Sequence, residues 1–170
     1  MRRQLLFCVE SNKKAHTDTV YINSTINRFY TNDRKVVYRP IFLESKTKYN
    51  DKGKVSEIKD RIKGFPGETK VIYFIDVDDY DISHATKELF DSIEKYCDDN
   101  DYELVYFCRD VEDVYWGDSI SKDEKVKKAE NFNRNKLIDS VKEEKLKVKS
   151  KKRHCSNILV VLDKYLERKS

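Results

Sequence analysis

The sequence predicts an α/β fold in which a mainly parallel sheet of about four strands carries helices on both faces. Apolar runs at 4–10 and 70–76 are too continuous for half-exposed strands and are typical of strands buried in a parallel sheet. Helix-like segments separate four such runs, and connections of this length suit parallel crossovers. A chain of 170 residues is most simply one domain and is long enough to bury such a core.

The four strands are expected at 4–10, 35–43, 70–76 and 102–108. The first and third strands are the most continuously apolar. Pro40 cannot donate a ladder hydrogen bond, so it places the second strand at an edge of the sheet or at a bulge.

Helices are expected between the strands. Ile22, Ile26 and Phe29 recur at helical spacing after Thr17, which predicts a first helix with Asp18 in its first turn. A polar loop at 46–53 is expected to precede a short helix at about 56–63. A third helix is expected to begin after a capping residue, Ser83, and its apolar face comprises Ala85, Leu89, Phe90, Ile93, Tyr96 and Cys97.

The chain after residue 120 is expected to form a basic helical extension. Ser121 and Glu124 have the spacing of a capping box, and the Lys-rich stretch 142–153 suits a long loop or an exposed helix. A closing helix with His154 at its head follows. We therefore divide the chain into a core at 1–120 and an extension at 121–170 that packs on the same domain.

Composition excludes several classes of protein. No segment approaches the ~18 apolar residues of a membrane helix, and the first apolar run is too short for a signal peptide. The four cysteines contain no C-x-x-C pair, which argues against a zinc knuckle and for reduced, buried thiols. A cytoplasmic protein without disulfides is expected, and nothing in the sequence indicates its oligomeric state.

Charge is distributed unevenly along the chain. Residues 73–118 contain 15 acidic and 3 basic side chains, a net charge of −12, whereas residues 122–153 contain 13 basic and 6 acidic ones, a net charge of +7. The acidic segment is suited to binding cations, and the basic segment is suited to binding a polyanion. The alternative is that both are solvated faces of opposite sign.

Two strands end at carboxylates. Glu10 follows the first strand, and Asp76 and Asp78 end the third. Open α/β sheets bind ligands beyond the carboxyl ends of their strands, so these side chains are expected to converge. Oxygen ligands of this kind suit Mg²⁺ or Mn²⁺. The alternatives are a polar strand end at Glu10 and a turn after Asp76 whose aspartates cap the next helix.

An apolar strand ending in Glu, a helix, and a later apolar strand ending in Asp-x-Asp together resemble the Toprim domain. That family includes topoisomerases, primases and small defence-associated nucleases of the overcoming-lysogenization-defect and RloB-like kinds. The resemblance covers about residues 4–110. It implies that Glu10 is a general acid/base or metal ligand and that Asp76 and Asp78 bind Mg²⁺.

Residues 110–115 also look like the Ile-Glu-Asn-Tyr segment of some of these proteins, which adds Glu112 to the metal site. The alternative for Glu112 is a structural role. Ser11 stands where the family has a glycine, and no glycine follows the Asp-x-Asp motif. These departures favour simple hydrolysis over strand passage or nucleotidyl transfer.

Basic residues near these motifs are the candidates for contacting a nucleic-acid backbone. The candidates are Lys13, Lys14, Arg109, Lys151, Lys152 and Arg153. The alternatives are ordinary surface lysines and, for Arg109, pairing with neighbouring acids. Tyr115 and Trp116 suit either stacking on a base or packing beneath a loop.

The sequence thus predicts an Mg²⁺- or Mn²⁺-dependent Toprim-type nuclease acting on DNA or RNA, which suits prokaryotic phage defence. The alternative is a non-catalytic Toprim-like module that binds nucleic acid or protein and acts with an ATPase subunit, because the chain lacks a G-x-x-x-x-G-K loop. A haloacid-dehalogenase phosphatase also uses Asp-x-Asp. That family, however, expects the motif on the first strand and a Thr or Val where Tyr80 stands.

Overall fold

The computed structural model describes all 170 residues and contains one four-stranded sheet in which every neighbouring pair is parallel. The strands are β1 (Arg3–Val9), β2 (Val36–Phe42), β3 (Glu68–Asp76) and β4 (Glu103–Phe107), and they lie in the order β2-β1-β3-β4. The predicted fold class is confirmed. β2, which contains Pro40, is an outer strand, as the missing N–H of proline requires.

The register brings the carboxyl ends of the strands to one edge of the sheet. Val9, the last residue of β1, lies opposite Phe42 of β2 and Phe74 of β3. Asp76, the last residue of β3, lies opposite Phe107 of β4. Side chains that follow these strands are therefore neighbours in space although they are far apart in sequence.

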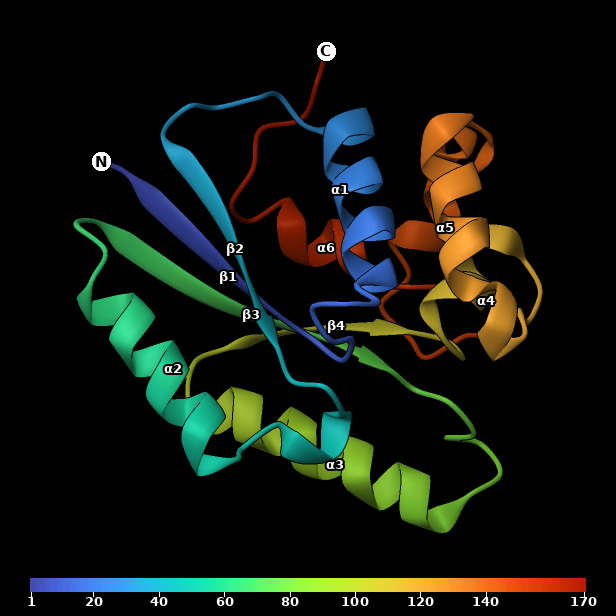
Figure 1. Ribbon diagram of the computed structural model, residues 1–170, viewed down its shortest axis with the longest axis horizontal. Helices are drawn as coiled ribbons and strands as arrows, with labels where there is room; N and C mark the ends of the chain where they lie inside the picture. Colours follow the sequence, from blue (N-terminus) through green and yellow to red (C-terminus); the bar gives the residue numbers. More distant parts are fainter.

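Helices cover both faces of the sheet (Figure 1). One face carries α1 (Thr17–Phe29), α4 (Val111–Trp116), α5 (Lys125–Arg134) and α6 (Ile158–Leu162). The other face carries α2 (Lys52–Lys63) and α3 (His84–Asp99). Short 3-10 turns lie at Lys46–Lys48, Lys122–Glu124, Leu137–Ser140 and Glu143–Leu146.

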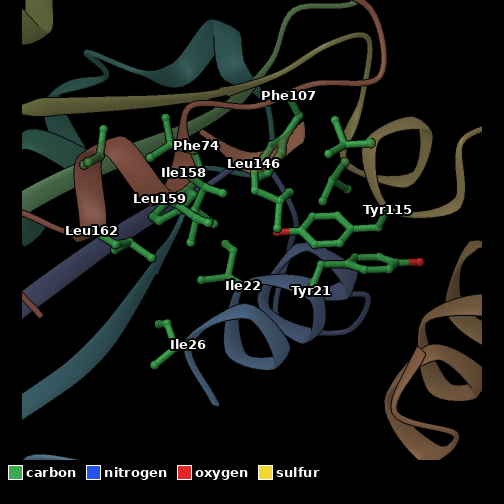
Figure 2. Close-up of a cluster of buried hydrophobic side chains, with 14 of the residues drawn as sticks. Tyr21, Ile22, Ile26, Phe74, Phe107, Tyr115, Leu146, Ile158, Leu159 and Leu162 are labelled. Carbon is green, nitrogen blue, oxygen red and sulfur yellow. The ribbon is translucent and has the colours of Figure 1, made fainter. Parts of the chain in front are cut away.

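The larger core lies beneath α1 and includes the C-terminal segments. It comprises 25 buried residues, and Phe132, Ile138, Leu146 and Leu162 pack in the same cluster as Leu5 of β1. Figure 2 shows side chains of this cluster, drawn from α1, the sheet, α4 and the C-terminal part of the chain. A smaller cluster of 14 buried residues fills the space between the sheet and the α2/α3 layer.

Two helix boundaries differ from the sequence-based prediction. α2 begins at Lys52 instead of Ser56, because the side chain of Asp51 accepts hydrogen bonds from the Gly53 and Lys54 N–H groups and caps the helix early. The closing helix begins at Ile158, so His154 does not head it. Ser83 caps α3 as predicted, by accepting from the Thr86 N–H. No helix is long and apolar enough to span a bilayer.

Candidate functional site

Glu10 and Asp76 meet at the carboxyl edge of the sheet. β1 and β3 are adjacent, and a carboxylate oxygen of Glu10 accepts a hydrogen bond from the backbone N–H of Asp76. The Asp76 carboxylate in turn accepts from the Val111 N–H at 3.0 Å, at the start of α4. These two hydrogen bonds hold the C-terminal ends of β1 and β3 and the N-terminal end of α4 close together.

The segment after β4 adds two further carboxylates. Asp110 caps α4 by accepting from the Asp113 N–H at 2.8 Å, and Glu112 lies in the first turn with only 1% of its surface exposed. The Nζ atom of Lys125, the first residue of α5, lies 3.2 Å from Glu112 and 3.7 Å from Asp110. Packing of α5 beside α4 therefore supplies the cation that compensates this buried glutamate.

Asp18 is a member of the cluster that the sequence reasoning took only as a helix-start residue. It lies in the first turn of α1, and its charge raises the pKa of both Glu10 and Asp76. The signal was present in the sequence. A helix that follows a parallel strand after a short loop begins at the carboxyl edge, so its first turn faces the same crevice.

Lys46 is the other residue that sequence reasoning missed, because it lies in the segment read as a polar loop. Its Nζ atom donates to the Asp76 carbonyl oxygen at 2.8 Å and forms an ion pair with Asp78. Lys46 follows β2, the strand next to β1. Its ammonium group thus crosses over the end of β1 to reach the end of β3.

Asp78 lies outside strand β3. The strand ends at Asp76, and Asp78 has a left-handed backbone with φ of 51° and a side chain that is 48% exposed. Side-chain alternation along β3 therefore does not align Asp78 with Asp76. Lys46, which contacts both, is what links them.

Burial and mutual repulsion make the cluster hard to ionise. Removal from water raises the pKa of Glu10 to about 8 and the pKa of Asp76 well above its ordinary range. The pKa values of Asp18 and Glu112 are also raised, chiefly by burial. Six neighbouring carboxylates, at residues 10, 18, 76, 78, 110 and 112, thus share only two ammonium groups, those of Lys46 and Lys125.

The carboxylate oxygens of the cluster are suitable ligands for a divalent cation, but the carboxylates are not arranged to bind one. No group of three or more His, Cys, Asp or Glu side chains is placed so that it could hold a metal ion. Peptide N–H groups and ammonium groups occupy the carboxylate oxygens instead. A hard cation at this site would therefore have to replace the ammonium groups of Lys46 and Lys125, and the excess negative charge would favour such an exchange.

The basic candidates fall into two groups. Lys13, Lys14, Lys152 and Arg153 are exposed, and neither they nor the half-buried Arg109 forms an ion pair. Lys151 differs, because its Nζ atom lies 3.8 Å from Glu94 and 5.0–5.7 Å from the centroids of three aromatic rings. The rings belong to Tyr80, Phe90 and Tyr106. Lys151 is therefore held against the α3 layer.

Tyr115 and Trp116 pack inside the molecule. Tyr115 stacks on Tyr21 (Figure 2). Their ring centroids are 5.2 Å apart, and the Tyr115 hydroxyl lies 2.6 Å from Thr25 Oγ1. The indole N–H of Trp116 donates to the Tyr21 hydroxyl at 2.9 Å. Of the two roles that the sequence left open for this pair, the structure matches packing.

His154 pairs with a carboxylate that the sequence did not single out. Its Nδ1 atom lies 2.9 Å from Oδ2 of Asp113, which is 1% exposed, while the histidine side chain is 37% exposed. The backbone N–H of His154 donates to the Cys108 carbonyl at 2.7 Å, next to the end of β4. The segment around His154 is thus attached to the same edge of the sheet as the carboxylates.

Comparisons with protein-family models, with curated proteins and with solved structures find no match to this chain. What the site can do chemically therefore has to follow from its own geometry. Its defining feature is a set of closely spaced carboxyl groups, most of them buried, at the carboxyl edge of a parallel sheet.

Proposed function

We propose that the chain hydrolyses phosphodiester bonds of DNA or RNA with the aid of Mg²⁺ or Mn²⁺, in the manner of the Toprim nucleases that its sequence resembles. The observation that carries this proposal is the cluster of six carboxylates with only two ammonium groups at the carboxyl edge of the sheet. A polyanionic substrate would be repelled by such a cluster unless cations neutralised it. A bound divalent ion would supply that charge.

Glu10, Asp76, Asp78 and Glu112 are the residues that would hold the ion. When bound, the ion would polarise a phosphoryl oxygen and make a water molecule easier to deprotonate. Glu10 suits the role of proton acceptor, because burial raises its pKa to about 8, close to neutral pH. One of its oxygens accepts from the Asp76 N–H, and the other is left to take the proton.

The exposed basic residues fit a nucleic-acid partner. Lys13 and Lys14 lie in the loop that follows Glu10, and Lys152 and Arg153 precede His154, whose N–H donates to the Cys108 carbonyl beside β4. Contacts of this kind would provide salt-sensitive affinity that does not depend on base sequence. A cytoplasmic location belongs to the same proposal, since all four cysteines are free and buried. The phage-defence role rests on the resemblance alone.

A second candidate function is a non-catalytic module that binds nucleic acid or protein and acts with an ATPase partner. The observation that favours it is that Lys46 and Lys125 already pair with carboxylates of the cluster. A carboxylate cluster whose charge is balanced by lysines of the same chain can serve the structure without binding a metal ion. Metal binding without cleavage would distinguish this function from the nuclease.

The test is cleavage of labelled single-stranded DNA, duplex DNA and structured RNA with Mg²⁺ or Mn²⁺. Glu10→Gln and Asp76→Asn should each lower the rate at least ~100-fold, the usual minimum for loss of a general base or a ligand. Glu88→Gln is the matched control, because Glu88 is exposed on α3 and pairs only with His84. Its rate should equal that of the wild type.

Absence of cleavage by folded wild-type protein with either metal would contradict the nuclease and favour the binding module. Cleavage that survives both Glu10→Gln and Asp76→Asn would place any nuclease activity elsewhere. Circular dichroism of each variant would ensure that a lost activity reflects the site and not the fold.

A further inference from the structure

A cavity of about 340 Å³ lies between α1 and the outer strand β2. β2 is the edge strand next to β1 (Figure 1), and the cavity opens beside its middle residues. Cavities of roughly 300–1,000 Å³ accommodate small organic ligands. The volume is at the lower end of that range, which suits one nucleotide unit and not a large cofactor.

Aromatic side chains line this cavity. Phe7 is buried, whereas Tyr38 and Phe42 are partly exposed, and the rings of Phe7 and Tyr38 have centroids 5.6 Å apart. The His16 ring lies 6.4 Å from that of Phe42. Partly exposed rings in a concave site offer faces on which a flat heterocycle can stack.

Polar groups of α1 form the opposite side. Asn23 lines the cavity, is exposed, and makes no side-chain hydrogen bond within the protein. Its amide carries two donor hydrogens and an acceptor oxygen, the complement that the edge of a nucleobase requires. An apolar slot with one convergent amide is thus built for an aromatic, hydrogen-bonding ligand.

Two cations stand at the same cavity. Lys13 and Arg39 line it, are exposed, and form no ion pair in the protein. A second hollow of about 480 Å³ shares Lys13 and Phe42 with the first and adds two lysines, Lys14 and Lys54, and two carboxylates, Glu44 and Glu57. Phe42 lies opposite Val9, the residue before Glu10. Lys13, three residues after Glu10 in the chain, therefore lies at both hollows.

We propose that this cavity binds an unpaired nucleotide of a single-stranded nucleic acid. The base stacks on Tyr38 and bonds to Asn23, while Lys13 and Arg39 hold the adjoining phosphates. A duplex cannot use the cavity in this way, because its bases are already stacked and paired. The inference rests on the proposed function and deepens it by naming single strands as the substrate class.

The experiment measures fluorescence anisotropy of a short labelled single-stranded oligonucleotide, with a chelator present so that binding is separated from cleavage. Unlabelled duplex of the same sequence and a free mononucleotide serve as competitors. Tyr38→Ala and Asn23→Ala test the base contacts, and Lys13→Ala and Arg39→Ala test the phosphate contacts. Phe65→Ala and Lys63→Ala are matched controls, because both residues lie outside the cavity.

Tyr38→Ala should weaken single-strand binding roughly 5- to 150-fold, the range for loss of one base–aromatic stack. Lys13→Ala and Arg39→Ala should each lower the slope of log affinity against log salt by about 0.7. The controls should bind as the wild type does. Arg39 is exposed on an edge strand, so Arg39→Ala tests the proposal even where Tyr38→Ala proves unstable.

Absence of binding, equal affinity for duplex, or unchanged binding by the Tyr38 and Arg39 variants would overturn the proposal. Competition by free mononucleotide at the same concentration as the strand would overturn it as well, since the ligand would then be a free nucleotide. Failure of the nuclease itself is a separate outcome. A protein that binds single strands through Tyr38 and cleaves none of them retains this site and loses the proposed activity.

Discussion

Lys46 links Asp76, the last residue of β3, to Asp78, which lies just beyond the strand. Its ammonium group contacts the Asp76 carbonyl and the Asp78 carboxylate, and its pKa is affected most by burial, which lowers it, and then by the charge of Glu10, which raises it. The net pKa shift is upward, so Lys46 stays charged where a divalent cation would sit. Lysine and metal are therefore competitors for the same oxygens.

Lys46→Met tests this competition. Removal of the ammonium group should raise the affinity for Mn²⁺, by roughly tenfold for each ~1.4 kcal/mol of repulsion that is relieved. Isothermal titration calorimetry with Mn²⁺ measures the change. Lys48→Met is the matched control, because Lys48 lies on the same turn but pairs only with Glu44. Unchanged or weaker Mn²⁺ binding by Lys46→Met would show that the lysine does not occupy the cation site.

Residues 152–156 attach the end of the basic segment 122–153 to the sheet. Ser156 forms an isolated antiparallel bridge with Phe107, and the Cys108 N–H donates to the Cys155 carbonyl at 3.0 Å. Between these contacts, His154 adopts a left-handed backbone with φ of 62° and pairs with the buried Asp113. This pair joins the C-terminal segment to α4.

His154→Ala should lower the free energy of unfolding by about 1–3 kcal/mol, because it removes the polar side chain that lies 2.9 Å from the buried Asp113 carboxylate. Urea denaturation measures the loss. His84→Ala is the control, since that side chain is 85% exposed and its removal should change stability by no more than about 0.5 kcal/mol. A double-mutant cycle with Asp113→Asn separates the pair from the other contacts of His154, and additive losses would contradict the pairing.

The elements differ in how well the sequence predicted them. β1 and β3 were predictable because both of their faces are buried, which makes them continuously apolar, and Asp76 marks the end of its strand. The early start of α2 was missed because Asp51 lies in a polar run without an apolar period. Contacts such as Lys46–Asp78 join segments 32 residues apart and depend on the sheet order, which local patterns do not encode.

Part of the basic segment 122–153 lies against the acidic segment 73–118. Lys125 pairs with Asp110 and Glu112, Lys145 donates to the Val114 carbonyl at 2.9 Å, and Lys151 pairs with Glu94. The ion pairs of Lys125 and Lys151 neutralise charge within the protein, and all of these contacts hold the C-terminal region on the core. The lysines and arginines that remain exposed are those available to a polyanion.

The carboxylate cluster also makes the stability of the whole molecule depend on pH. Glu10 has an ordinary pKa of 4.5 and a folded-state pKa of about 8, and the pKa values of Asp18, Asp76 and Glu112 are raised as well. Between these values the folded state holds protons that the unfolded state has released. The stabilisation is therefore complete below the unfolded pKa and is lost as pH rises through the folded pKa.

Without metal, the free energy of unfolding should fall by up to about 1.4 kcal/mol per pH unit for each such proton between roughly pH 5 and 8. Denaturation across this range with a chelator measures the slope, and Glu10→Gln should flatten it because the amide does not ionise. Mg²⁺ should restore stability at pH 8, where it replaces the protons that the cluster has lost. A slope that is flat or rising in the wild type, or that is the same in Glu10→Gln, would show that these carboxylates ionise as they do in the unfolded chain.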